Sequence, residues 1–161
     1  MFAVFNEFGT DLLDLSTRLS ECGVTINFEN ATTVANCFQY AYISRVPELK
    51  INCTDLNKMF SSSKIGTIDK LILKDDGTQT FSQTFADATE LKNITIEGKI
   101  GNSIEFAQSS LLTAESVQSI IDALKDLTRL TKQTITFHKD VYISDTQKAK
   151  INSLNWSLSQ I

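Results

Sequence analysis

Few side chains in this 161-residue chain could act as a nucleophile, a general base or a metal ligand. The only histidine, His138, follows a short apolar alternation, and the three cysteines are Cys22, Cys37 and Cys53. Thiol catalysis needs a cysteine paired with a base, and a zinc site needs several ligands at short, fixed spacing. No two of these residues have such spacing. We therefore predict no catalytic residue, no metal site and no cofactor, and we interpret His138 as a partly exposed structural histidine.

The cysteines also bear on the compartment in which the chain folds. Their number is odd, and no CxxC pair occurs. Cysteine is among the most often buried residue types, and structural disulfides are rare in reducing compartments. We expect three buried thiols in a reducing compartment, with a single disulfide as the alternative.

Three further groups of residues are similar to ligand sites in composition alone. Residues 75–78, Asp-Asp-Gly-Thr, lack the alternating oxygen ligands and the distal glutamate of a calcium loop, so we predict a turn. Gly98 and Gly101 lack the pattern of a phosphate-binding loop. Two acidic pairs are predicted to be charges on helix surfaces: Asp11/Asp14 and Asp122/Asp126.

Charge and hydropathy exclude two classes of partner. The formal net charge is −4, and the 15 Lys and Arg residues are scattered, so we expect no binding to nucleic acid. No stretch reaches the roughly 20 apolar residues that span a bilayer, so we expect no membrane insertion. The first residues lack a basic segment followed by a long apolar one, which predicts no signal peptide and a cytoplasmic site of synthesis.

The elements that position these residues follow an internal repeat. When the chain is shifted by 22 residues along itself, five apolar positions coincide: Phe38/Phe60, Ile43/Ile65, Val46/Ile68, Leu49/Leu71 and Ile51/Leu73. A looser third copy contains Phe85, Leu91, Ile94 and Ile96. A period of about 20 to 29 residues is typical of a leucine-rich-repeat-like solenoid, in which each unit buries its apolar side against its neighbours. The spacing predicts that the phenylalanines are core residues.

Each repeat is predicted to contain a short turn of helix and a short strand. The helical turns are expected over residues 34–40, 56–61 and 81–87, and the strands over 49–51, 70–73 and 93–96. The only proline, Pro47, is expected just ahead of its strand, where a missing N–H costs least. Before the repeats, Thr10 is predicted to cap a helix that ends at Cys22, and residues 24–28 alternate like a strand.

The period breaks after Gly98, and the pattern that follows predicts a C-terminal cap. We expect a helix over 114–127 capped by Thr113, a strand over 134–137, a helix capped by Ser144 and a strand over 156–158. The predicted fold is therefore α/β: a short leucine-rich-repeat-like solenoid with a parallel strand ladder, an N-terminal capping helix and a C-terminal α/β cap. We expect one structural domain made of residues 1–23 (helical cap), 24–98 (repeats) and 99–161 (cap).

The outward side chains of the predicted strands form the only candidate binding surface that the sequence indicates. Because strand residues alternate between faces, we expect these side chains to form a ladder across one side of the solenoid. The ladder would accept a protein surface or the hydroxyls of a sugar, or it would remain a solvated face. The candidate residues are Thr25, Asn27, Lys50, Lys70, Ile72, Lys92, Thr95 and Thr136, with Asn93 and Glu97 at the edges.

Two stretches also resemble a known family. Residues 84–101 resemble the F-x-x-C-x-x-L-x-x-I-x-I unit of BspA-like leucine-rich repeats, with Ala88 at the cysteine position. Residues 111–128, together with 155–158, look like the C-terminal cap of such modules. Proteins with this cap occur in phages and prophages of gut bacteria, often as tail or other virion-associated proteins. The resemblance implies a non-enzymatic recognition or structural module, and it carries over no active-site residue.

These observations lead to three functional hypotheses. The first is a binding or assembly module of a phage or prophage virion, with a virion or host protein or a surface glycan as partner. The second is a free-standing phage-encoded inhibitor of a host protein. The third is a weak glycan hydrolase, which rests on the polarity of the ladder alone. We also expect self-association through the N-terminal end, where Phe2, Phe5 and Phe8 are similar to the remnant of an earlier repeat.

Overall fold

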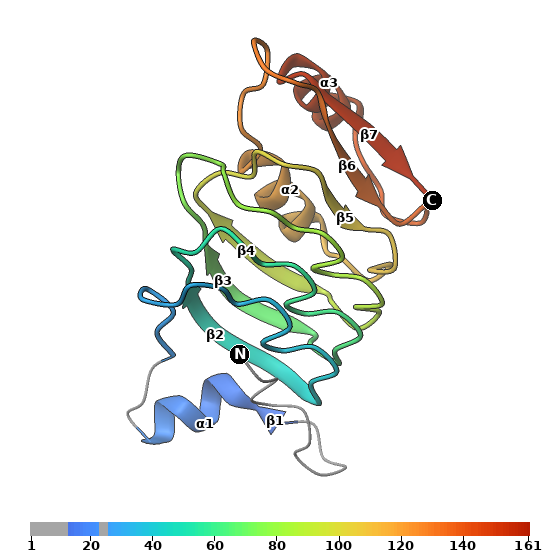
Figure 1. The fold of residues 1–161 in the computed structure, drawn as a ribbon. Helices are drawn as coiled ribbons and strands as arrows, with labels where there is room; N and C mark the ends of the chain where they lie inside the picture. Colours follow the sequence, from blue (N-terminus) through green and yellow to red (C-terminus); the bar gives the residue numbers. More distant parts are fainter. Residues whose placement is uncertain (1–12, 23–25) are drawn as a thin grey trace.

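The computed structural model describes residues 13–22 and 26–161, which form an α/β fold with two small parallel sheets (Figure 1). The first sheet has the order β1–β2–β3–β4 and the second the order β5–β6–β7. The strands are β1 (Leu13–Asp14), β2 (Ile43–Lys50), β3 (Thr67–Ile72), β4 (Asn93–Glu97), β5 (Ile104–Phe106), β6 (Gln133–Phe137) and β7 (Trp156–Gln160). The helices are α1 (Leu15–Cys22), α2 (Ala114–Asp122) and α3 (Asp145–Ser153).

Apolar positions that are equivalent in successive repeats pair with each other in the first sheet. Val46 of β2 pairs with Ile68 of β3, which pairs with Ile94 of β4, and all three side chains are buried. A second buried row joins Leu49, Leu71 and Ile96. The strands of the repeats are therefore parallel, as predicted, and the apolar positions that coincide in sequence lie side by side in space.

Strand β2 starts earlier than expected, and Pro47 lies inside it rather than ahead of it. The pairing between β1 and β2 ends at Arg45 of β2, so no residue of β1 lies opposite Pro47. The missing N–H of Pro47 therefore costs the sheet little. The prediction that β2 begins after the proline was wrong because it treated the whole strand as an interior one.

The segments that carry the repeat phenylalanines are not helical, which corrects a second prediction. Residues 34–41, 56–63 and 81–88, here called the turn segments, consist of successive turns. In each, two residues four apart have left-handed φ angles of 53° to 60°: Asn36 and Tyr40, Lys58 and Ser62, Gln83 and Asp87. A helix cannot contain such residues, so the spacing that suggested a helical turn belongs to a repeated chain of turns.

Hydrogen bonds explain why the turn segments take this form. In the first turn segment every second N–H donates to a carbonyl of the next layer, in or directly before the second turn segment: Val34 to Asp55, Asn36 to Asn57, Phe38 to Met59 and Tyr40 to Ser61. The N–H groups between them, as in Cys37 and Gln39, donate to the carbonyl three residues back. A helix would consume all these donors within one segment, whereas alternation leaves half of them to join neighbouring segments.

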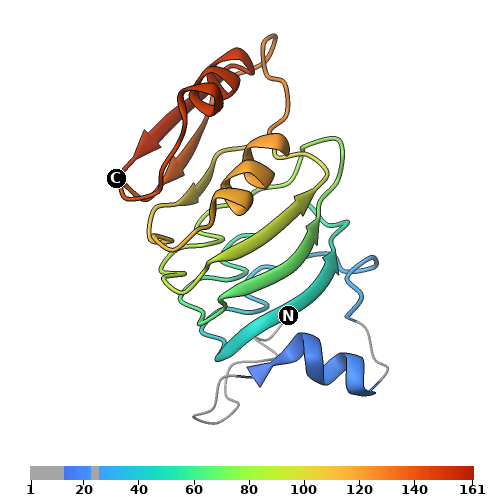
Figure 2. The same ribbon diagram turned by 180° about the vertical axis from the view of Figure 1, so that it is seen from behind.

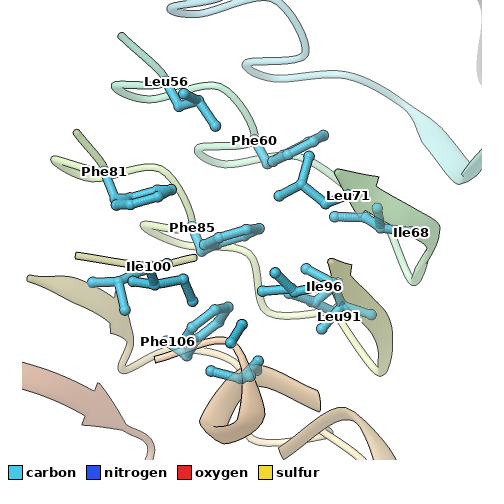
Figure 3. Packing of buried hydrophobic residues seen from close by; sticks show 14 of the residues in the cluster. Leu56, Phe60, Ile68, Leu71, Phe81, Phe85, Leu91, Ile96, Ile100 and Phe106 are labelled. Atoms are coloured by element: carbon cyan, nitrogen blue, oxygen red, sulfur yellow. The ribbon is translucent and has the colours of Figure 1, made fainter. Parts of the chain in front are cut away.

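The phenylalanines form a continuous column through the core. The ring centroids of Phe38 and Phe60, and of Phe60 and Phe85, are 5.5 Å apart, and each pair of rings is nearly parallel. The column continues with Phe106, 4.6 Å from Phe85, and then with Phe137 at 5.9 Å (Figure 3 shows Phe60, Phe85 and Phe106). The prediction that these side chains are core is confirmed, and the ring spacing extends beyond Gly98 even though the sequence period does not.

Secondary structure changes type along this column. On one side, β2, β3 and β4 give way to α2 and α3, and on the other the turn segments give way to β5, β6 and β7 (Figures 1 and 2).

Strand β5 was not predicted. Helix α2 ends at Asp122 instead of residue 127, because Ile100 donates to the carbonyl of Ala123 and accepts from the N–H of Lys125. The predicted caps Thr113 and Ser144 are confirmed, the latter in a capping box with Gln147.

At the N-terminal end, α1 begins at Leu15, so the prediction of Thr10 as its cap was wrong. The carboxylate of Asp14 accepts the N–H of Thr17 at 2.9 Å and serves the first turn instead. Of the predicted strand over 24–28, residues 24 and 25 lie outside the described residues, and residues 26 and 27 are not in a strand, so this part of the prediction was wrong. Phe28 alone forms a parallel bridge, with Ile51. Phe2, Phe5, Phe8 and Asp11 also lie outside the described residues.

The edge of β4 is closed by two serine hydroxyls of α2. Ser116 Oγ accepts the N–H of Ile94 at 3.0 Å and contacts the carbonyl oxygen of Lys92 at 3.2 Å. Ser119 Oγ accepts the N–H of Ile96 at 2.8 Å. The serines are three positions apart on the helix, and the residues whose N–H groups they accept are two positions apart on the strand. Helix α2 therefore supplies hydrogen-bond partners to the edge of β4, as another strand would.

We predict that Ser119→Ala destabilises the protein by about 1–3 kcal/mol, because the N–H of Ile96 would lose its partner at a covered edge. Urea unfolding followed by circular dichroism measures the change. Ser110→Ala is the matched control, because Ser110 is exposed and should change stability by less than about 0.5 kcal/mol. Equal stability of the two variants would contradict this function of the helix.

We predict that Phe60→Ala, in the middle of the ring column, costs about 3–5 kcal/mol of stability, because it removes contacts with rings on both sides. The same unfolding measurement applies. Tyr142→Ala, at a side chain that is 81% exposed, should leave stability nearly unchanged. A loss for Phe60→Ala no larger than that for Tyr142→Ala would show that the column does not hold the units together.

Candidate functional site

The outward side chains of β2, β3 and β4 form one surface, here called the strand face (Figure 2 shows the three strands side by side). Its members alternate with the buried rows described above. In β2 and β3 two outward residues separate the buried positions, whereas in β4 only Thr95 does, and the register shifts there. The strand face consists of Arg45, Glu48, Lys50, Thr67, Asp69, Lys70, Ile72, Asn93, Thr95 and Glu97.

Charged groups on the strand face are paired across strands. Lys70 Nζ lies 3.3 Å from a carboxylate oxygen of Glu48 on β2 and 3.4 Å from one of Glu97 on β4. Arg45 Nε donates to Asp69 at 2.7 Å. These partners raise the pKa of Lys70 above its usual value, because Glu48 and then Glu97 stabilise its charged form. The face therefore presents charges of both signs that are paired across neighbouring strands.

Lys50 is held in the same way at the neighbouring edge. Its Nζ lies 2.5 Å from Glu29, which raises the pKa of Lys50 and lowers that of the Glu29 carboxyl. The side chain of Asn27 also contacts Glu29, and its Oδ1 accepts the Glu29 N–H at 2.7 Å. Asn27 and Lys50 are thus connected through Glu29, a residue that the sequence analysis did not single out.

The structure brings together part of the predicted ladder. Lys50, Lys70, Ile72 and Thr95 lie on the strand face. Lys92 directly precedes β4, is exposed, and accepts the Thr113 N–H at its carbonyl. Thr136 lies in β6 of the second sheet and does not belong to this face, and Thr25 lies outside the described residues. The prediction placed Thr136 on the wrong surface because it assumed that every strand of the chain belongs to one sheet.

Sequence reasoning missed three charged members of the strand face, namely Arg45, Glu48 and Asp69. The predicted strands began at residues 49 and 70, whereas β2 and β3 begin at Ile43 and Thr67. A signal was available, because Ile43, Val46 and Leu49 recur every three residues and all three are buried. The prediction assumed that buried and outward residues alternate strictly, and it therefore did not recognise this three-residue spacing.

A second surface lies where the third turn segment meets the second sheet. There a groove of about 530 Å³, here called the polar groove, opens between residues 80–83 and strands β5 and β6. It is lined by Thr80, Phe81, Ser82, Gln83, Asn102, Ser103, Ile104, Glu105, Gln133, Thr134 and Thr136. Thr136, which the strand face lacks, is therefore part of this groove.

The polar groove exists because the hydrogen-bond ladder between turn segments stops. In the second segment, Leu56 and Lys58 donate their N–H groups to Thr80 and Ser82. The equivalent donors of the third segment, Phe81 and Gln83, have no hydrogen-bond acceptor within residues 13–22 and 26–161. Strand β5 is extended whereas the third segment is folded into turns, so the two backbones do not match in register.

Side chains join the two layers on either side of this interruption. Asn102 Nδ2 donates to the carbonyl of Gln79 at 2.8 Å, and Ser109 Oγ donates to that of Ala88 at 3.0 Å. Gln79 is itself fully buried and donates to the carbonyls of Ile51 and Cys53. The layers are thus held together at both ends, with the Phe85–Phe106 contact between them.

The residues weighed for chemistry are in structural surroundings. His138 Nδ1 accepts the N–H of Asp140 at 3.1 Å, at the end of β6. Asp76 accepts both the N–H and the hydroxyl of Thr78, which lowers the pKa of Asp76 to about 2, and residues 75–76 form the predicted turn. Within the part of the chain that the structure describes, no group of three His, Cys, Asp or Glu side chains could hold a metal ion.

The remaining candidates are likewise explained by packing. Gly98 has a φ angle of +91°, and a Cβ there would lie 2.2 Å from the carbonyl oxygen of Leu73. A Cβ at Gly101 would likewise lie 2.2 Å from the carbonyl oxygen of Gly77. Asp122 accepts from Lys150 and Gln118, which lower its pKa. The glycines therefore allow close approach of neighbouring backbones, and Asp122 connects α2 to α3.

Comparison with known proteins identifies no relative. No family model, no curated protein and no solved structure matches the chain. Among the described residues, no helix is both long and apolar enough to cross a membrane.

The described thiols, Cys37 and Cys53, are free and buried, as expected. Burial raises the pKa of Cys37 to about 11, far above pH 8, so this thiol stays protonated and unreactive in the folded protein. We predict that Cys22→Ser protein exposed to Ellman's reagent at pH 8 reacts slowly when native and at both thiols after unfolding in guanidinium. Immediate reaction of the native protein would contradict the burial of these thiols.

Proposed function

We propose that this protein is a non-enzymatic binding or assembly module, built as a short leucine-rich-repeat-like solenoid, and that the strand face is its contact surface. The observation that carries the proposal is the cross-strand pairing of Arg45 and Lys70, together with the pairing of Lys50 with Glu29 in the adjacent turn, on an exposed sheet. Side chains that are already ordered lose less entropy when a partner binds. A fixed pattern of alternating charge favours one partner over others.

The solenoid interpretation is supported by features that recur from unit to unit. The turn segments share a buried phenylalanine and two left-handed residues, and the first two also share a ladder of N–H groups that donate to the next layer. Each buries its apolar side against the next, which is the principle of repeat architectures. The resemblance of residues 84–101 and 111–128 to BspA-like modules then suggests a phage or prophage origin, as a virion-associated structural or host-recognition protein.

A non-enzymatic function is supported by the surroundings of the reactive side chains. Cys37 is buried in the first turn segment, and His138 lies at the end of β6 against Asp140. Glycoside hydrolysis, the third hypothesis, commonly requires two carboxyl groups about 5–10 Å apart across a substrate site. On the strand face, where that hypothesis places the activity, the carboxylates of Glu48 and Glu97 pair with Lys70, and Asp69 pairs with Arg45. This surface therefore suits binding better than cleavage.

The proposal is tested by a substitution that changes the centre of the strand face without touching the core. Thr95 is exposed on β4 between two buried residues, so Thr95→Arg should fold normally and obstruct a partner. We predict that immobilised wild-type protein retains one stoichiometric partner from an extract of phage-infected cells, and that Thr95→Arg loses it. Quantitative mass spectrometry of the retained proteins measures this.

Thr146→Arg on α3 makes the same change at an exposed residue away from the strand face, and it should retain the partner. Retention by Thr95→Arg equal to that by Thr146→Arg, or no stoichiometric partner at all, would contradict the proposal. Mass spectrometry of purified virions then separates the two forms of the hypothesis: a virion module is present in particles, whereas a free inhibitor of a host protein is absent from them.

A further inference from the structure

The polar groove is distinct from the strand face in position and in chemistry. It lies between the third turn segment and strands β5 and β6, whereas the strand face lies on β2, β3 and β4. Its volume of about 530 Å³ lies within the range of roughly 300–1,000 Å³ typical of small-molecule sites. The lining contains no lysine, arginine or histidine, and its apolar members Phe81 and Ile104 are buried beneath the polar ones.

Hydrogen-bond donors in the groove are left unused by the fold. The N–H groups of Phe81 and Gln83 lack the acceptors that their equivalents have in the two preceding turn segments, as far as the described residues extend. Gln133 uses its Oε1 to accept from both the N–H and the hydroxyl of Ser103, which leaves its amide NH₂ as a donor. An unsatisfied backbone N–H is costly unless water or a ligand accepts it.

Acceptors and hydroxyls complete the set. The Glu105 side chain is exposed on β5, and no described residue donates a hydrogen bond or an ion pair to it. The hydroxyls of Thr134 and Thr136 extend from the adjacent strand β6 into the same lining. The groove thus offers backbone donors on the turn-segment wall, and a carboxylate, hydroxyls and the Gln133 amide on the strand wall, which requires a ligand that both accepts and donates.

We propose that the polar groove is a saccharide-binding site. Sugar hydroxyls accept from amide N–H groups and donate to a carboxylate, so a single ring can satisfy both walls. An anionic ligand would meet Glu105 without a compensating cation, and an apolar ligand would cover polar groups without pairing them. An extended peptide is disfavoured because the Phe85–Phe106 contact, at 4.6 Å, closes the gap between the layers beyond Gln83.

Part of the site is ordered before a ligand binds. Ser103 fixes the Gln133 amide, and Ser103 Oγ in turn accepts the N–H of Thr134 at 3.0 Å. Asn102 is fixed by its bond to the carbonyl of Gln79. These contacts reduce the entropy lost on binding.

Saturation-transfer NMR on the 161-residue protein tests the proposal with free glucose, galactose, mannose, N-acetylglucosamine and their disaccharides as probes. We expect transfer to at least one saccharide, with Glu105→Gln and Thr136→Val each weakening its affinity by about tenfold. Glu115→Gln on α2 and Thr146→Val on α3 make the same changes at exposed residues outside the groove and should leave the affinity unchanged.

Several outcomes would overturn the assignment. They are no transfer to any probe, transfer that persists in Glu105→Gln and Thr136→Val, and shifts of the Gln83 and Glu105 amides by a mixed tetrapeptide pool but by no sugar. Because the strand-face test uses Thr95→Arg and a protein partner, the failure of either proposal leaves the other intact.

Discussion

The column of phenylalanine rings is the interaction on which the rest of the structure depends. From Phe38 to Phe137, each ring lies against the ring of the next layer, so no layer buries its own core residue alone. This coupling explains why the spacing between rings can vary from 21 to 31 residues without interrupting the column. What must be conserved through the fold is the position of the ring, whereas the chain between rings is free to change.

The secondary structure of the chain between rings changes after residue 98, and it changes on both sides of the layers. Strands become helices on one side, and turns become strands on the other. The first change is accommodated well, because Ser116 and Ser119 replace the partners that β4 would find in another strand. The second is accommodated less well, because turns and an extended strand differ in backbone register. The polar groove is the consequence of that mismatch, and its unused donors are the reason to regard it as a binding site.

The strand face follows from the opposite situation, in which neighbouring layers match closely. Because β2, β3 and β4 are nearly in register, Lys70 lies between Glu48 and Glu97, and Arg45 reaches Asp69. Charges that are scattered along the sequence become an ordered pattern of both signs. A regular part of the stack therefore presents a charged surface, which we propose contacts a protein, and the irregular junction presents the polar groove, which we propose binds a sugar.

Much of this was determined by the sequence. The coincident apolar positions identified the parallel rows of the first sheet and the phenylalanine core, and local capping residues located the starts of α2 and α3, because both signals depend on nearest neighbours in the chain. The tertiary structure alone decided the rest. The turn segments avoid the helix because half of their N–H groups are needed by the next layer, and the ring column reaches Phe106 and Phe137 through layers of different length. Thr136 joins the groove instead of the strand face for the same reason: the second sheet exists only once the layers have stacked, and no local pattern of residues records which neighbour a backbone donor will find.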